Sequence, residues 1–246
     1  MAAPALVALA NGCRDQRSAR TVTALVDEVK SQRPDLRVEK AYLERSRPEF
    51  QKVVDRLVRA GFEEIVVVPL LLSDPPSGTV ASEAVAEATE RHPGLRIRVT
   101  ATLGLEACFL EVLDVRMREA LKESRVRELD ALVLAAAGST DPLANQAVAR
   151  LARLWGTHHK LPVTAAYAAS APPATGEAVR AFRGEGRRHI AVASLFLTPG
   201  PLVDTATELA LEAGAVAVSE PMGAHPEVAR TVLARYAVGA VELVPV

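Results

Sequence analysis

The chain has 246 residues, of which 49% are hydrophobic, 4% are aromatic and 24% are charged, and its formal net charge at pH 7 is −1. This balance argues against a nucleic-acid partner, since there is no basic surface and few aromatic residues for base stacking. Two cysteines cannot form a disulfide framework, and no apolar run approaches the ~18 residues of a membrane helix. We therefore expect a cytoplasmic protein without membrane contact.

Short apolar runs alternate with helical stretches from the start of the chain. In the first half the runs predict strands over 5–10, 37–43, 64–71 and 96–102. The run 65–68 is continuously apolar, as is typical of strands covered on both faces of a parallel sheet. Between the first two strands, residues 18–32 place apolar residues on one helical face (Val22, Leu25, Val26 and Val29), and Pro34 ends the helix.

The second half continues the same alternation, with strands predicted over 131–136, 162–168, 189–196 and 215–219. Alternating strands and helices predict a doubly wound α/β sheet with right-handed crossovers.

The two halves also resemble each other in sequence. "LVALANGCRD" at 6–15 matches "LVLAAAGSTD" at 132–141, and "GFEEIVVVPLLLS" at 61–73 matches "GRRHIAVASLFLT" at 186–198. We predict two homologous half-domains, 1–123 and 130–246, joined by a short linker at 124–129. Each is expected to be a flavodoxin-like or Rossmann-like unit with a parallel four-stranded sheet.

Ligands of open parallel sheets bind where the strands end, so the site is expected there, in a cleft between the two halves. The glycine-containing turns that precede the first and fifth helices would leave backbone N–H groups for carboxylates or phosphates. Neither a GxGxxG nor a Walker motif is present, so nothing favours a nucleotide. The residues that follow the predicted strands are Asn11, Gly12, Cys13, Glu44, Ser73 and Asp74 in the first half, and Gly138, Ser139, Thr140, Thr198, Glu220 and His225 in the second.

Histidine and cysteine are the obvious candidates for metal or proton chemistry. His225 is the histidine expected at the strand ends, where it would either bind a metal or only help to start the last helix. Cys13, next to a helix start and to Arg14, is either a nucleophile or metal ligand or simply a small residue that a tight turn needs. Cys108 is expected in the core. The other histidines are expected at the opposite sheet edge, with the adjacent pair diverging as a solvated surface pair: His92, His158, His159 and His189.

The turn at 11–15, the run "VVVPLLLS" at 66–73, the "LG" at 103–104 and the degenerate second copy together resemble the sirohydrochlorin chelatases of the CbiX/SirB type. These class II chelatases insert divalent iron or cobalt into a cyclic tetrapyrrole during cobalamin or siroheme biosynthesis. The resemblance covers essentially the whole chain and is greatest to the long, two-half versions of actinobacteria. It implies a chelatase-like fold, a lyase activity, and iron or cobalt as substrate rather than as a resident cofactor.

The resemblance also implies site residues. The two family histidines correspond to Asn11 and Ser77, which are the implied catalytic positions, although asparagine is a poor metal ligand and no base. Implied contacts to the substrate come from Gly12, Cys13, Arg14, Ser73, Asp74, Gly138, Ser139 and Thr198. Candidate metal ligands are Cys13, Glu44, Asp74 and His225.

Three hypotheses about function stand. The chain is a chelatase that uses other ligands, a non-catalytic carrier of a tetrapyrrole or metal, or a diverged enzyme for another small polyanionic substrate. We favour the first, with a tetrapyrrole-like or other anionic small molecule as partner and a monomer with pseudo-two-fold halves.

Overall fold

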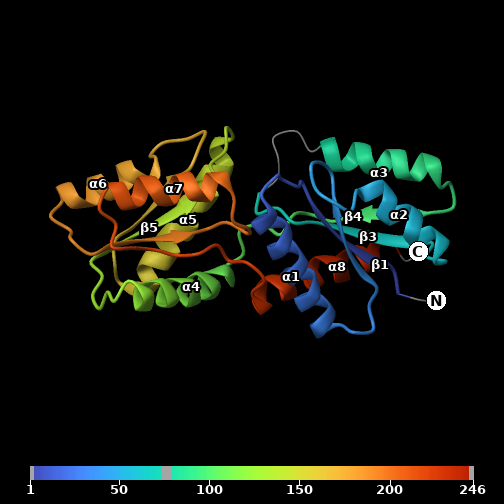
Figure 1. The fold of residues 1–246 in the computed structure, drawn as a ribbon, viewed down its shortest axis with the longest axis horizontal. Coiled ribbons are helices and arrows are strands. Elements are labelled where there is room, and N and C mark those ends of the chain that lie inside the picture. Colours follow the sequence, from blue (N-terminus) through green and yellow to red (C-terminus); the bar gives the residue numbers. More distant parts are fainter. Residues whose placement is uncertain (1–2, 74–78, 244–246) are drawn as a thin grey trace. The chain divides into compact units, whose positions relative to one another are not determined.

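Two parallel sheets of four strands organise the chain in a computed structural model that describes residues 3–73 and 79–243 (Figure 1). The first unit contains Met1–Gly104 and Ala224–Val246, and the second contains Leu105–Gly223. Helices cover both faces of each sheet, as expected for a doubly wound α/β fold.

The two sheets have the same strand order, which confirms the predicted fold class. In the first, the order is β2-β1-β3-β4, and in the second it is β6-β5-β7-β8. The strands of the first sheet are β1 (Ala5–Ala10), β2 (Val38–Tyr42), β3 (Glu64–Pro69) and β4 (Arg96–Val99). Those of the second are β5 (Ala131–Ala136), β6 (Val163–Tyr167), β7 (Ile190–Ser194) and β8 (Ala217–Val218).

The helices alternate with the strands along the chain. They are α1 (Gln16–Gln32), α2 (Phe50–Arg59), α3 (Thr79–Arg91), α4 (Phe109–Glu123), α5 (Pro142–His159), α6 (Thr175–Gly184), α7 (Pro201–Glu212) and α8 (Pro226–Glu242). The apolar face predicted for the first helix is buried, because α1 covers the first sheet with Val22, Leu25, Val26 and Val29.

Several predicted strands extend beyond the observed ones at their carboxyl ends. The prediction 64–71 ends in the structure at Pro69, and 189–196 ends at Ser194. Apolar residues continue past these points because the chain stays buried after leaving the sheet. Leu70 is 5% exposed, and its N–H still donates to the Leu9 carbonyl at 2.7 Å. Leu195 repeats this contact with Ala135 in the second sheet, at 2.8 Å.

The last helix of each sequence half packs on the other half's sheet. α4 follows β4 along the chain but contacts β7 and β8, whereas α8 ends the chain and contacts β3 and β4. The units in space therefore differ from the predicted half-domains 1–123 and 130–246 by an exchange of helices. Residues 124–129 join α4 to β5 within the second unit rather than joining two units.

Candidate functional site

The turn that follows β1 presses against the loop that follows β2, at the carboxyl edge of the first sheet, where its strands end. Gly12 has φ +85°, and a Cβ built on it would lie 1.9 Å from the Glu44 carbonyl oxygen. The Glu44 N–H donates to the Asn11 carbonyl at 2.9 Å. Glycine is required here both by the backbone conformation and by the close approach of the two loops.

Ser46 fixes Cys13 in the same place. Its Oγ accepts a hydrogen bond from the Cys13 N–H at 3.2 Å and donates one to the Cys13 carbonyl at 2.9 Å. The half-buried Cys13 thiol lies 3.6 Å from the Asp15 carbonyl, to which it donates. Burial, and then the charge of the nearby Cys13 side chain, raise the pKa of Tyr42. Ser46 could not be predicted as a site residue, because a single serine in a polar loop forms no recognisable sequence pattern.

These contacts bring Asn11, Cys13 and Glu44 together at one sheet edge. Asn11 is exposed, and the Glu44 side chain is 61% exposed with Arg45 as its ion-pair partner at 3.7 Å. A thiolate and a carboxylate are both ligands for divalent first-row metals, and a carboxylate also accepts protons. The edge therefore holds donor groups of the kind that metal chemistry needs, without an imidazole at the end of β1.

The helices that follow the two glycine-containing turns, α1 and α5, each begin at an aspartate of the chain that accepts a backbone N–H. Asp15 caps α1 by accepting from the Arg17 N–H at 2.8 Å, and Asp141 caps α5 by accepting from the Leu143 N–H at 2.9 Å. Hydrogen bonds from the Arg17 side chain and backbone hold the pKa of Asp15 below its usual range. At each of these two helix starts, one of the backbone N–H groups therefore already has a carboxylate of the chain as its partner.

The second unit has a matching turn that is held by different hydrogen bonds. Gly138 has φ +86°, and its Cβ would lie 1.9 Å from the Ala169 carbonyl oxygen. The Asn145 side chain accepts from the Ser139 N–H at 3.0 Å and donates to the Ser139 carbonyl at 2.7 Å. Ser139 Oγ accepts from the Asp141 N–H at 3.0 Å. Ser139 is therefore held by its own turn and helix, whereas Cys13 is held by a loop from the next strand.

The remaining predicted site residues are placed as follows. Arg14, Ser73, Thr140 and Glu220 are exposed, and Thr198 is half-buried after β7. Asp74 and Ser77 lie outside the described residues. His225 is the N-cap of α8, where its Nδ1 accepts from the Glu227 N–H at 3.2 Å, so it does help to start the last helix. Cys108, expected in the core, is half-buried and is the N-cap residue of α4.

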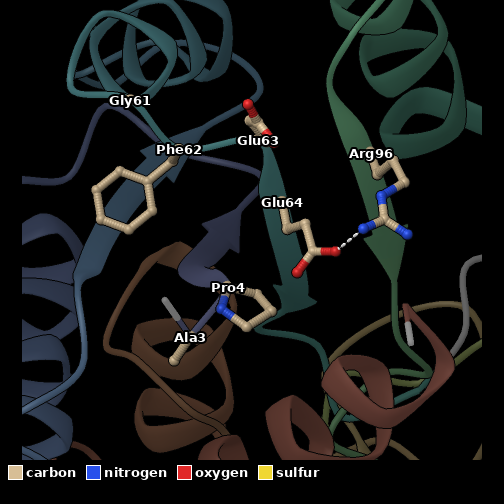
Figure 2. Close-up of a pocket in the computed structure, with 7 residues that line it drawn as sticks. All are labelled: Ala3, Pro4, Gly61, Phe62, Glu63, Glu64 and Arg96. Atoms are coloured by element: carbon tan, nitrogen blue, oxygen red, sulfur yellow. Dashed lines mark hydrogen bonds and ion pairs between the residues drawn. The ribbon is translucent and has the colours of Figure 1, made fainter. Parts of the chain in front are cut away.

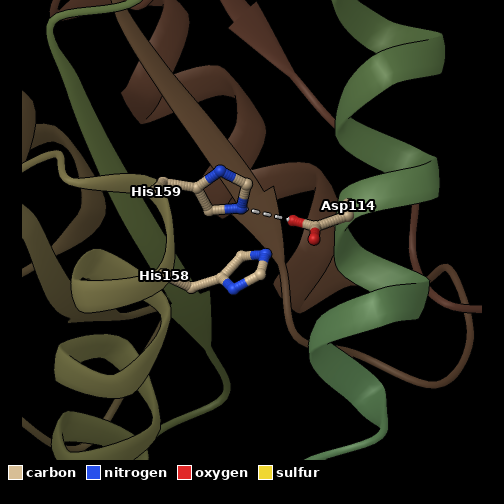
Figure 3. A group of neighbouring side chains, drawn as sticks. All are labelled: Asp114, His158 and His159. Atoms are coloured by element: carbon tan, nitrogen blue, oxygen red, sulfur yellow. Dashed lines mark hydrogen bonds and ion pairs between the residues drawn. The ribbon is translucent and has the colours of Figure 1, made fainter.

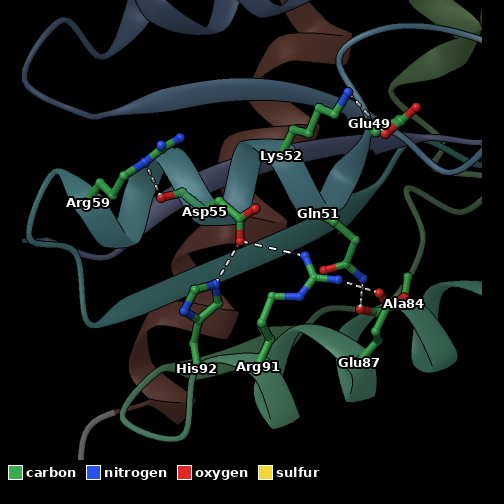
Figure 4. A network of polar contacts seen from close by, with 9 residues as sticks. All are labelled: Glu49, Gln51, Lys52, Asp55, Arg59, Ala84, Glu87, Arg91 and His92. Carbon is green, nitrogen blue, oxygen red and sulfur yellow. Dashed lines mark hydrogen bonds and ion pairs between the residues drawn. The ribbon is translucent and has the colours of Figure 1, made fainter.

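Two of the other histidines make structural contacts away from the carboxyl edges. His92 Nε2 lies 2.8 Å from Asp55 Oδ1, which joins the end of α3 to α2 (Figure 4). That hydrogen bond is the main reason why the pKa of Asp55 is lowered, and Arg91, 3.7 Å away, adds to it. The His189 N–H donates to Asp130 at 3.1 Å just before β7 begins.

The adjacent pair His158 and His159 does not diverge as predicted. Their ligand nitrogens and a carboxylate oxygen of Asp114 all lie within 4.8 Å of one another (Figure 3). Asp114 belongs to α4 and the histidines end α5, so the cluster forms because α4 packs in the second unit. The adjacent histidines resemble a metal site in the sequence, but no pattern pointed to Asp114, which stands 44 and 45 residues away from them in the other half of the repeat.

A pocket lies at the opposite, amino edge of the first sheet (Figure 2). It is lined by Ala3, Pro4, Gly61, Phe62, Glu63, Glu64 and Arg96, and an ion pair joins Glu64 to Arg96. Because ligands of parallel sheets bind at the carboxyl ends of the strands, this pocket is not a candidate for the site. Within residues 3–73 and 79–243, no helix combines the length and apolar character needed to cross a membrane.

Comparison with known proteins finds sirohydrochlorin cobaltochelatases similar to this chain. A 27% identity over 176 residues relates the chain to the sirohydrochlorin cobaltochelatase of Priestia megaterium, covering 70% of this chain and 57% of that protein. The sirohydrochlorin cobaltochelatase of Sulfurisphaera tokodaii is 28% identical over 87 residues, which cover 35% of this chain and 70% of that protein. The chain thus spans little more than half the length of the Priestia relative.

Solved structures share the fold. SirB from Bacillus subtilis with Fe³⁺ superposes with a TM-score of 0.80 at 22% identity, covering 98% of this chain and 96% of that one. CbiX, described as the terminal enzyme for biosynthesis of siroheme in denitrifying bacteria, has a TM-score of 0.69 at 18% identity, covering 98% and 100%. The sequence model of the CbiX family matches residues 5–120 and 131–238, which is most of the chain and both of its similar halves. The chain therefore belongs to the CbiX family.

Proposed function

We propose that this protein is a sirohydrochlorin-chelatase-like enzyme that inserts divalent iron or cobalt into a cyclic tetrapyrrole. The observation that carries the proposal is the match of the CbiX family model to both halves, 5–120 and 131–238. The metal ion is a substrate of this reaction, and the two halves are proposed to act within a single chain.

The reaction needs a ligand that presents the ion and a base that accepts two pyrrole protons, because M²⁺ replaces two N–H protons of the macrocycle. At the carboxyl edge of the first sheet we assign the ion to the Cys13 thiolate and the proton transfer to the exposed Glu44 carboxylate, which accepts one pyrrole proton at a time and passes it to solvent. The support is their placement beside Asn11, the position at which the family resemblance implies a catalytic histidine. Glu44 is held there by its N–H, 2.9 Å from the Asn11 carbonyl.

Exposed guanidinium groups border the same edge and suit an anionic tetrapyrrole. Arg14 is exposed, and the side chains of Arg45 and Arg47, in the loop after β2, are 65% and 71% exposed. Guanidinium groups bind carboxylates in planar, two-point fashion. We assign recognition of the substrate's carboxylates to these arginines.

A second candidate function, a non-catalytic carrier of tetrapyrrole or metal, is favoured by one observation. Asn11 directly follows β1 at the position where the resemblance implies histidine, and an amide neither titrates near neutral pH nor binds most metals well. A carrier needs to hold its ligand without accepting protons from it.

Visible absorption distinguishes the two functions. The purified protein is mixed with sirohydrochlorin and then with Co²⁺ or Fe²⁺, and Glu44→Gln and Cys13→Ser are compared with Glu212→Gln, an exposed carboxylate on α7. Insertion that fails in Glu44→Gln but persists in Glu212→Gln supports the enzyme. A spectral shift without insertion supports the carrier, and the absence of any shift contradicts both.

Introducing histidines at the two positions where the family resemblance implies them also tests whether the protein is an enzyme or a carrier. We expect Asn11→His with Ser77→His to raise the insertion rate about 10²-fold, the typical contribution of a positioned base. Either change alone should do much less, because one imidazole cannot both hold the ion and take its protons. Asp74→His is the alternative partner for Asn11→His. If sirohydrochlorin binds but neither double variant inserts metal, the enzyme proposal gives way to the carrier.

A further inference from the structure

We propose that Asp114, His158 and His159 form a binding site for a divalent transition-metal ion. One ligand atom from each residue lies within 4.8 Å of those of the other two. Both imidazoles extend from the end of α5 towards the carboxylate on α4 (Figure 3). Two imidazoles and one carboxylate are a donor set that Zn²⁺, Co²⁺ and Ni²⁺ accept readily, whereas Mg²⁺ and Ca²⁺ prefer oxygen ligands throughout.

The carboxylate is held in place by a buried partner. Asp114 Oδ1 accepts the indole N–H of Trp155 at 2.7 Å and lies 2.7 Å from His159 Nε2. Trp155 is 0% exposed, so the donor that orients the carboxylate is itself fixed by the core. Such outer hydrogen bonds to a ligating group are a regular feature of metal sites.

The two imidazole rings lie close together on the same side of α5, as a shared metal site requires. The His159 ring meets Trp155 edge to face, with centroids 5.6 Å apart and an interplanar angle of 89°. The His158 ring stands at 90° to that of His159, with centroids 4.9 Å apart. Adjacent residues on a helix normally face different directions, but these two imidazoles share one side.

Small side-chain movements bring the three ligand atoms to the spacing of a bound ion. A tetrahedral ion with bonds of ~2.1 Å needs ligand atoms about 3.4 Å apart. His158 is exposed, so its side chain has room to turn. The 2.7 Å hydrogen bond between His159 Nε2 and Asp114 Oδ1 is replaced on binding by a bond from each of these atoms to the ion. Both histidines stand in the last turn of α5, and the C-terminal end of a helix favours positive charge. Three protein ligands leave a coordination position for water.

Bound there, the ion would join α4 to α5. α4 is the helix that the second unit takes from the first half of the sequence. An ion that binds the folded chain raises its stability according to its affinity and concentration. The role is therefore a retained, structural one, and it does not depend on the proposed chelatase activity at the carboxyl edge of the first sheet.

The test uses the full chain, stripped with a chelator and given Co²⁺ or Zn²⁺ without any tetrapyrrole. The background variant Cys13→Ser/Glu44→Gln removes the two residues to which the proposed function assigns the ion and its protons, so that binding by them cannot mask the result. The Co²⁺ absorption spectrum and the shift in Tm are measured for this background and for His158→Gln and His159→Gln added to it. His92→Gln is the matched control, because His92 also pairs with an aspartate at 2.8 Å but has no second histidine beside it.

We expect the background protein and His92→Gln to bind one Co²⁺ per chain at this site and to gain thermal stability from it. His158→Gln and His159→Gln should each weaken Co²⁺ binding at least about 10-fold. Loss of a residue that only hydrogen-bonds to a metal ligand already weakens metal binding by that factor. His158→Gln is the more decisive variant, because the exposed His158 ring can be removed without disturbing the Trp155 and His159 hydrogen bonds of Asp114. Co²⁺ binding that is equally tight in both histidine variants and in His92→Gln would overturn the proposal.

Discussion

At the scale of single residues, glycine has the same task in both units. Gly12 and Gly138 stand in the left-handed region, and each lets its turn approach a carbonyl of the neighbouring loop, Glu44 in one case and Ala169 in the other. The matching turns in the sequence predicted this pair of positions. Ser46 and Asn145, which lock the two turns, could not be predicted, because each is one polar residue whose partner is decided only by the folded loops.

We expect Gly12→Ala to destabilise the first unit more than Gly61→Ala. Both glycines have φ +85°, but a Cβ at position 61 meets nothing within 4 Å, whereas one at position 12 meets the Glu44 carbonyl. The left-handed conformation alone costs a residue with a side chain about 1–2 kcal/mol, so Gly61→Ala measures that cost and Gly12→Ala adds displacement of the loop that carries Glu44. Urea unfolding of the two variants checks this, and equal losses would show that the close approach is unimportant.

At the scale of elements, the sequence predicted the order and number of strands well and their carboxyl ends less well. Continuous apolar runs identify buried strands, but buried loops such as the one that contains Leu70 are apolar too. Side-chain contacts between different helices could not be predicted from the sequence. The link between Asp55 on α2 and His92 after α3 joins residues 37 positions apart that no periodicity relates.

This link gives a pH-dependent contribution to stability. The hydrogen bond from His92 lowers the pKa of Asp55 in the folded chain. Its contribution is therefore present above the unfolded-state pKa of about 3.9, and it is lost as the pH falls through the lower folded-state value. The Asp55 side chain is 35% exposed, so solvent screening limits the contribution to at most about 1 kcal/mol.

Urea unfolding between pH 5 and pH 3 should show the wild type losing more stability than His92→Gln. His158→Gln, measured in metal-free buffer, controls for the removal of an imidazole as such. If the wild type and His92→Gln lose stability in parallel over this range, the hydrogen bond does not set the Asp55 pKa.

At the scale of the whole molecule, the two units exchange helices in a repeated way. Arg116 on α4 donates to the Met222 carbonyl at 3.1 Å, and Arg235 on α8 donates to the Leu103 carbonyl at 2.8 Å. Each arginine thus anchors its helix to the segment just before the point at which the chain passes to the other unit. Because the two halves resemble each other, α4 and α8 could each pack on either sheet. Which sheet each helix packs on depends on side-chain contacts that cannot be read from the similarity of the two halves. The Asp114, His158 and His159 cluster was missed for the same reason.

The fit of α8 on the first sheet can be tested at Gly239. A Cβ there would lie 2.7 Å from Val66 Cγ1 and 2.8 Å from Thr100 Cγ2, so the helix rests directly on β3 and on the residue after β4. We expect Gly239→Ala to cost about 1–3 kcal/mol, the usual range for overpacking, although alanine favours helix over glycine. Gly184→Ala, at the end of α6 where a Cβ meets nothing within 4 Å, should be neutral or slightly stabilising. Urea unfolding monitored by circular dichroism compares the two variants. A Gly239→Ala protein as stable as Gly184→Ala would mean that α8 does not pack against the first sheet as closely as the structure describes.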